Sequence, residues 1–150
     1  MIAAELGGSW VVDASVAFGW FAAVPGSEQA TRLLDAGPAA QLLAPDLVLV
    51  ELLNTAWKSL RLGAITTEQF QVLAHRAAEP FHRLLPSAAL LARAGHWCRE
   101  LDHPAYDCLY VALAERENAT LITADQRLLR KLEQPRPGLP AALDLAFLTT

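Results

Sequence analysis

Cysteine and long apolar runs are both scarce in this sequence of 150 residues. The two cysteines, Cys98 and Cys108, do not form a CxxC spacing, which argues against a disulfide framework and against a thiolate zinc site. No uninterrupted apolar run reaches the length of about 18 residues that a membrane span needs. Met1–Ser9 contain neither a basic segment nor a long apolar run, so we expect no signal peptide and a cytoplasmic location.

Charged residues are also few. They make up 19% of the chain, against about 25% in a typical globular domain. The net charge of −4 and the pI of about 5.5 speak, at first sight, against a nucleic-acid partner. The mean hydropathy of +0.25 fits either a surface that a partner covers or a well-packed α/β domain. The length predicts that residues 1–150 form a single domain.

Short apolar runs alternate with segments of helical pattern along the chain. Strands are expected at Ser9–Val12, Gln41–Ala44, Phe81–Leu85, Thr120–Thr123 and Leu143–Leu148. Helices are expected at Val16–Phe21, Ser27–Leu34, Asp46–Leu62, Thr66–Glu79, Ala88–Leu101, Tyr106–Asn118 and Gln126–Leu132, the fourth of them opening with a capping box at Thr66. Ser15 is the expected N-cap of the first helix, and Pro45 suits the first turn of the third. This alternation predicts an α/β fold with a mainly parallel central sheet covered by helices on both faces.

Four acidic residues lie inside otherwise apolar segments: Asp13, Glu51, Asp107 and Asp125. Each lies close to the point where a strand is expected to end or a helix to begin. The carboxyl ends of parallel strands form one edge of a sheet, where ligand sites occur, so all four side chains can face the same edge. Burying a carboxylate is costly unless it is paired, and the sequence offers no matching set of four embedded Lys or Arg residues.

A divalent metal ion is therefore the expected partner of these carboxylates. Oxygen-rich sites suit Mg²⁺ or Mn²⁺, which can orient a phosphodiester and activate a water molecule. Stabilisation of a helix N-terminus is an alternative that explains Asp107 well, but it explains neither Glu51 nor Asp13. Once the four acids are assigned to a metal, the remaining net charge is zero, and Arg and Lys side chains can still form a local patch for nucleic acid.

Four segments that contain these acids resemble the PIN-domain family, and in particular the VapC toxins of bacterial and archaeal toxin–antitoxin pairs. In order along the chain they are Val11–Ser15 (VVDAS), Pro45–Asn54 (PDLVLVELLN), Tyr106–Ala114 (YDCLYVALA) and Leu121–Leu128 (LITADQRL). The resemblance extends from Val11 to about Leu132. It implies a three-layer α/β/α PIN-like nuclease domain.

The resemblance further implies a hydrolase: an endoribonuclease toxin that depends on Mg²⁺ or Mn²⁺ and cleaves RNA phosphodiesters. It also implies a small VapB-like antitoxin that neutralises the toxin, and a toxin homodimer. The four acidic positions of the family, which are catalytic and bind metal, match Asp13, Glu51, Asp107 and Asp125, and its accessory polar positions match Ser15, Asn54 and Thr123. Cys108 departs from the pattern, since a small Ala is common at that position.

Two other classes of protein are alternatives to this interpretation. A PIN-like module that binds RNA or protein without catalysis would be marked by the loss of an acid, and all four are present. A phospho-receiver domain would have an adjacent acidic pair after the first strand and a Lys at the end of a late strand. Trp10–Asp13 contains a single acid and Thr120–Thr123 contains no Lys, so the receiver class is disfavoured.

A few further residues have two open interpretations. His103 precedes Asp107; it is either a surface or cap residue, as expected for most of the histidines, or a contact to substrate. Arg127, with Arg130 and Lys131, either contacts phosphate or forms a solvated helix face. The apolar segment Ser15–Phe21 is expected to receive the antitoxin, with a basic side chain of the antitoxin placed at the carboxylates.

Overall fold

Five short parallel strands form the centre of the fold in the computed structural model, which describes residues 7–148. Their order across the sheet is β3-β2-β1-β4-β5. The strands are β1 Gly8–Val12, β2 Ala40–Pro45, β3 Arg83–Leu85, β4 Thr120–Thr123 and β5 Ala142–Asp144. The helices are α1 Ala14–Ala17, α2 Ser27–Asp35, α3 Leu47–Arg61, α4 Thr67–Arg76, α5 Ser87–Leu101, α6 Ala105–Glu117 and α7 Gln126–Leu132. The prediction of a three-layer α/β/α fold with a parallel sheet is confirmed.

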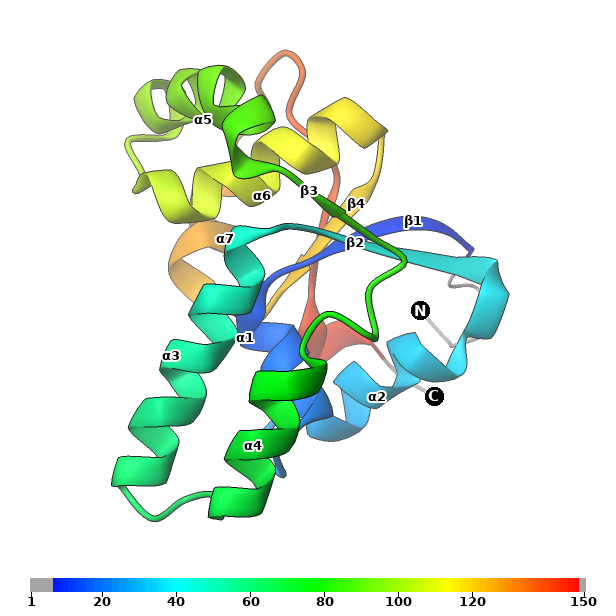
Figure 1. The fold of residues 1–150 in the computed structure, drawn as a ribbon. Coiled ribbons are helices and arrows are strands. Elements are labelled where there is room, and N and C mark those ends of the chain that lie inside the picture. The colour runs from blue at the N-terminus through cyan, green and yellow to red at the C-terminus, as the bar shows by residue number, and fades with distance from the viewer. Residues whose placement is uncertain (1–6, 149–150) are drawn as a thin grey trace.

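Helices cover both faces of the sheet. In Figure 1, α5 and α6 lie above the strands, and α2, α3 and α4 lie below them. Val11, Val12, Leu121 and Ile122 of the two central strands have no exposed surface, as expected for a parallel sheet that is buried on both faces. Within the described residues, no helix combines the length and the apolar character required to cross a membrane.

The strand order places a topological switch point between β1 and β4. The chain runs outward from β1 through β2 to β3, and then returns to the other side of β1 to form β4 and β5. Val12 pairs with Ile122 at the carboxyl end of this pair of strands. Ligands in open α/β sheets bind in the crevice outside such a switch point, so this edge is where the fold favours a functional site.

Several exposed apolar side chains lie together on α3 and α4. Val50, Leu53 and Trp57 of α3 are 64%, 41% and 45% exposed, and they line an apolar pocket together with Phe70 of α4. The segment Ser15–Phe21 presents much less apolar surface. Phe18 is buried and Trp20 and Phe21 are half-buried, because this segment packs against α2 and against Phe81. The segment that was expected to receive the antitoxin therefore exposes less apolar surface than α3 and α4 do.

Three local predictions are also corrected. Ser15 lies inside α1, and Asp13 is the N-cap, because the Asp13 carboxylate accepts the Val16 N–H. Pro45 ends β2 instead of opening the next helix, which begins at Leu47 after the N-cap Asp46. The last strand stops at Asp144, whose carboxylate accepts the Ala146 N–H and starts a 3₁₀ turn.

Candidate active site

A cavity of about 420 Å³ opens at the carboxyl edge of β1 and β4. The four acidic residues predicted from the sequence all line it, although they come from four different elements. Ser15 and Asn54 line it as well, while Thr123 is buried directly behind Asp13. The complete lining is Asp13, Ala14, Ser15, Phe18, Glu51, Asn54, Thr55, Asp107, Tyr110 and Asp125.

Asp13 is the most deeply buried of the four acids, with 4% of its surface exposed. It directly follows β1, so the strand delivers its carboxylate to the edge of the sheet. The Ser15 hydroxyl donates to Asp13 Oδ1 over 2.5 Å, and the Thr123 hydroxyl donates to Oδ2. Burial raises the pKa of Asp13 to about 6, and the nearby Asp107 charge adds to this rise, while the Ser15, Thr123 and Val16 hydrogen bonds oppose it.

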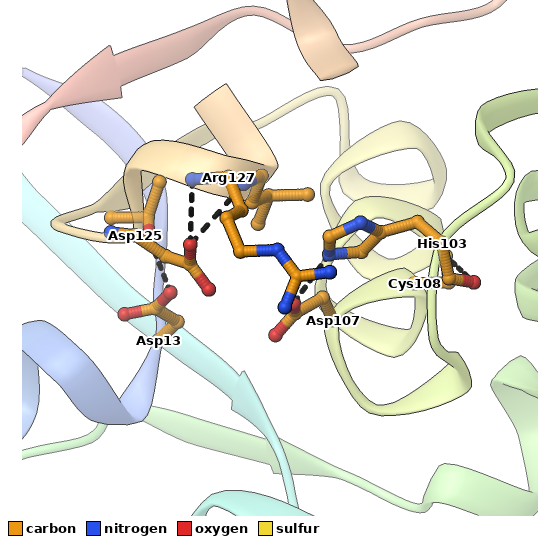
Figure 2. A network of polar contacts seen from close by, with 8 residues as sticks. Asp13, His103, Asp107, Cys108, Asp125 and Arg127 are labelled. Carbon is orange, nitrogen blue, oxygen red and sulfur yellow. Dashed lines mark hydrogen bonds and ion pairs between the residues drawn. The ribbon is translucent and has the colours of Figure 1, made fainter. Parts of the chain in front are cut away.

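Asp125 is held by the start of α7, as Figure 2 shows. Its Oδ1 accepts the backbone N–H groups of Arg127 and Leu128 at 2.9 and 3.2 Å. Two hydroxyls bind this loop to the end of β1: Ser15 Oγ accepts the Ala124 N–H, and Thr123 Oγ1 accepts the Asp125 N–H. The accessory residues Ser15 and Thr123 therefore fix Asp13 and Asp125 relative to each other.

Glu51 reaches the cavity from the second turn of α3 and is half-buried. Tyr110 of α6 donates a 2.6 Å hydrogen bond to Glu51 Oε1. Burial raises the pKa of Glu51; the Tyr110 hydrogen bond opposes this rise and the Asp107 charge adds to it. Burial and the Glu51 charge together raise the pKa of Tyr110, so its hydroxyl remains a donor.

Asp107 lies in the first turn of α6 and pairs with a histidine that was expected to be a surface or cap residue. His103 is 8% exposed, and its Nε2 lies 2.6 Å from Asp107 Oδ2. The loop that carries His103 is fastened at its backbone, because the His103 carbonyl oxygen accepts the Cys108 thiol at 3.6 Å. Figure 2 shows the imidazole directed at Asp107, so His103 contacts a carboxylate and is not a surface residue.

Arg127 provides a basic side chain beside the acidic cavity. Its backbone N–H caps Asp125, its side chain is exposed, and in the view of Figure 2 the guanidinium extends from α7 toward Asp107. Within the described residues it makes no ion pair shorter than 4.0 Å. An exposed cation beside an acidic cavity is suited to a phosphate group.

The donor set of the cavity fits a hard divalent cation. All four charged groups are carboxylates, which are ligands that Mg²⁺ and Mn²⁺ accept. In the described part of the chain, Asp13, Glu51 and Asp125 have no ion-pair partner, and the charge of Asp107 raises the pKa of both Asp13 and Glu51. A bound cation would relieve this repulsion. Among residues 7–148, no three His, Cys, Asp or Glu side chains lie close enough together to hold an ion in this arrangement.

Comparisons with known proteins agree with this fold. A family model described as PIN domain matches residues 10–133. Ribonuclease VapC3 of Pyrobaculum aerophilum is 31% identical over 123 residues, which cover 81% of this chain and 92% of that protein.

Three solved structures share the fold at lower identity. VapBC2 from Rickettsia felis, bound to a DNA fragment from its promoter, has a TM-score of 0.66 at 19% identity and covers 91% of this chain and 98% of its own. PAE2754 from Pyrobaculum aerophilum has a TM-score of 0.61 at 22% identity, with coverages of 95% and 88%. FitAB bound to the IR36 DNA fragment has a TM-score of 0.60 at 18% identity, with coverages of 94% and 98%.

Proposed function

The chain belongs to the PIN-domain family, and from this premise we propose that it is a VapC-type toxin: a Mg²⁺- or Mn²⁺-dependent endoribonuclease neutralised by a cognate antitoxin. The observation that carries the proposal is a single cavity that four carboxylates line, with no balancing set of cations among the residues that line it. The ribonuclease activity of the relative at 31% identity supports RNA as the substrate. Family membership also removes the phospho-receiver alternative.

Asp13, Glu51, Asp107 and Asp125 would hold the metal. When bound, the ion would orient the scissile phosphodiester, activate a water molecule and stabilise the departing oxygen. The chain itself supplies rigidity, because hydroxyls of Ser15 and Thr123 hold Asp13, His103 holds Asp107 and the start of α7 holds Asp125. Ligands fixed in this way need little rearrangement when substrate arrives.

Arg127 is proposed to contact an RNA phosphate next to the cleaved bond. The net charge of −4 gives no overall attraction for RNA, so a local basic side chain must provide it. Arg130 and Lys131 follow on the same helix and extend this basic face away from the cavity. The contact orients the backbone and carries no base specificity.

Cleavage of a defined RNA by the purified chain tests the proposed activity. We expect cleavage with Mg²⁺ or Mn²⁺, none in EDTA, and none by Asp13→Asn in either condition. Asp35→Asn is the matched control, because it makes the same chemical change at an exposed carboxylate outside the cavity, and it should cleave normally. If the wild-type chain binds RNA without cleaving it, the alternative of a non-catalytic PIN-like RNA- or protein-binding module is correct.

The antitoxin is proposed to bind along α3 and α4. Asn54 lines the acidic cavity, and it also lines the apolar pocket that contains Trp57 and Phe70. The two surfaces are therefore continuous. One amphipathic antitoxin segment could cover the apolar pocket and place an Arg or Lys at the carboxylates, which would exclude both metal and RNA. Expression of the wild-type chain alone should arrest growth, whereas Asp13→Asn should not. If cells that express either form grow equally well, the toxin assignment is contradicted.

We also propose a homodimer, for which the apolar surface excess is the support. Light scattering of the purified chain should give a mass near twice 16.2 kDa. A mass of one chain at micromolar concentration would refute it.

A further inference from the structure

Tyr110 is a buried tyrosine whose hydroxyl ends at the candidate active site. The residue is 1% exposed, and it lies on α6 one turn after Asp107. Its hydroxyl lines the cavity and donates to Glu51 Oε1 at 2.6 Å. This contact joins two helices across 59 positions of sequence, and within residues 7–148 Glu51 has no ion-pair partner.

The position of Tyr110 on its helix explains why it reaches Glu51. Residues three apart on a helix lie on the same face, so α6 directs Asp107 and Tyr110 toward the same cavity. Asp107 contributes its own carboxylate there, while Tyr110 contributes a donor to a carboxylate that comes from α3.

Glu51 needs such a partner more than the other acids do. Asp13 and Asp125 are short side chains, and each is fixed by backbone N–H groups of the helix that follows it. Glu51 is longer, has one more rotatable bond and lies in the second turn of α3, so it does not cap the helix start as Asp13 and Asp125 do. Among the described residues, the Tyr110 hydroxyl is the hydrogen-bond partner that the structure gives to its carboxylate.

We propose that Tyr110 is a positioning residue that holds Glu51 with one carboxylate oxygen on the tyrosine hydroxyl and the other free to face the metal. This inference rests on the proposed metal-dependent function. Groups that orient a ligand in this way typically contribute about 10–100-fold to metal affinity or activity. Tyr110 touches neither metal nor RNA in this proposal and acts through Glu51.

The substitution Tyr110→Phe separates positioning from packing, because phenylalanine keeps the buried ring and removes the hydroxyl alone. The control is Tyr106→Phe, which removes the same group from the same helix at a residue that is 64% exposed and does not line the cavity. Titration calorimetry with Mn²⁺ alone should show about 10-fold weaker binding by Tyr110→Phe, the lower end of the range for such groups. Tyr106→Phe should bind as the wild type does.

Cleavage kinetics and a double-mutant cycle show whether Tyr110 acts on metal binding through Glu51. Tyr110→Phe should lower kcat with the KM for RNA unchanged, since Glu51 contacts metal and not the RNA chain. In a Glu51→Gln background, adding Tyr110→Phe should change Mn²⁺ affinity by less than about 2-fold, because coupled residues are non-additive. The Mn²⁺-induced rise in Tm is measured against the metal-free Tm of each variant, so a loss of stability alone does not imitate a loss of metal binding.

The outcomes separate this proposal from the proposed function. If the wild type binds Mn²⁺ and cleaves RNA while Tyr110→Phe does both equally well, Tyr110 is not a positioning residue and the proposed function stands. An additive effect of Tyr110→Phe in the Glu51→Gln background would also overturn the proposal. If the wild type neither binds Mn²⁺ nor cleaves RNA, the proposed function and this inference both fall.

Discussion

Asp13→Asn should stabilise the metal-free protein while it abolishes activity. Asp13 is buried beside Asp107, and its carboxylate accepts from Ser15, Thr123 and the Val16 N–H. An asparagine has nearly the same shape, and its side-chain oxygen is an equally good N-cap acceptor for α1. The substitution therefore removes the buried charge and leaves the helix cap in place.

The expected gain follows from the pKa of Asp13. Burial raises that pKa from 3.8 to about 6, and at 1.36 kcal/mol per pKa unit the ionised carboxylate destabilises the folded state by about 3 kcal/mol. The amide nitrogen of asparagine cannot accept, so one hydroxyl hydrogen bond is lost, at a cost of about 1 kcal/mol. The net gain near pH 7.5 is about 2 kcal/mol, which corresponds to about 4–8 °C in Tm for a chain of this size.

The gain depends on pH in a defined direction. The pKa of Asp13 is higher in the folded state than in the unfolded chain, so the folded state binds more protons between pH 3.8 and about 6. The stability that protonated Asp13 contributes is therefore fully present below pH 3.8 and is lost as the pH rises through about 6. Near pH 4 the wild type is already protonated at Asp13, and the advantage of Asp13→Asn should disappear.

Thermal unfolding in EDTA at pH 4 and pH 7.5 measures this effect, with Asp35→Asn as the exposed control. Added Mn²⁺ should raise the Tm of the wild type and leave that of Asp13→Asn nearly unchanged, because only a protein that binds the ion gains from it. The reasoning is refuted if metal-free Asp13→Asn melts at or below the wild type at pH 7.5, or if the difference is the same at both pH values.

Three further variants test other parts of the structure. His103→Leu removes the hydrogen-bond partner of Asp107 and should lower kcat by about 10-fold. His103→Gln keeps a donor at this position and should retain most activity. Equal activity of the two variants would contradict the role of the hydrogen bond. Arg127→Gln should reduce the slope of log KM against log salt concentration by about 0.7, the value for one phosphate contact to single-stranded nucleic acid. Arg116→Gln, which changes an exposed arginine on another helix, should leave this slope unchanged. Leu121→Ala empties a fully buried position of β4 and should lower the free energy of unfolding by about 2–5 kcal/mol in urea; a change below about 1 kcal/mol would contradict its place in the core.

The sequence predicted the parts of the fold that local pattern controls. β4 and α7 have the bounds that were expected, Thr120–Thr123 and Gln126–Leu132, because a buried strand is a continuous apolar run. The Thr66 capping box at the start of α4 is also a local signal, and the structure has both of its hydrogen bonds. The last strand was predicted too long because the cap at Asp144 competes with strand extension over the same residues.

The sequence predicted the four acids of the site but not the hydrogen bonds that Tyr110 and His103 make to them. The acids stand out because a carboxylate in an apolar segment requires an explanation. The Tyr110–Glu51 contact spans 59 positions, and no local pattern encodes it; an aromatic residue on an apolar helix face fits the core equally well. His103 was misplaced although it lies only four residues before Asp107, because it precedes the first residue of α6 and the helical spacing rule does not extend to the loop.

The central claim is that the four carboxylates enclose one divalent metal site. Anomalous diffraction from crystals soaked in Mn²⁺ tests it directly, with the same soak of Asp13→Asn as the control. The account predicts a peak in the cavity at about 2.1–2.3 Å from carboxylate oxygens that include Asp13 and at least one more of the four acids, and no such peak in the variant. A Mn²⁺ ion bound only outside this cavity, or one that persists in Asp13→Asn with unchanged occupancy, would contradict the account.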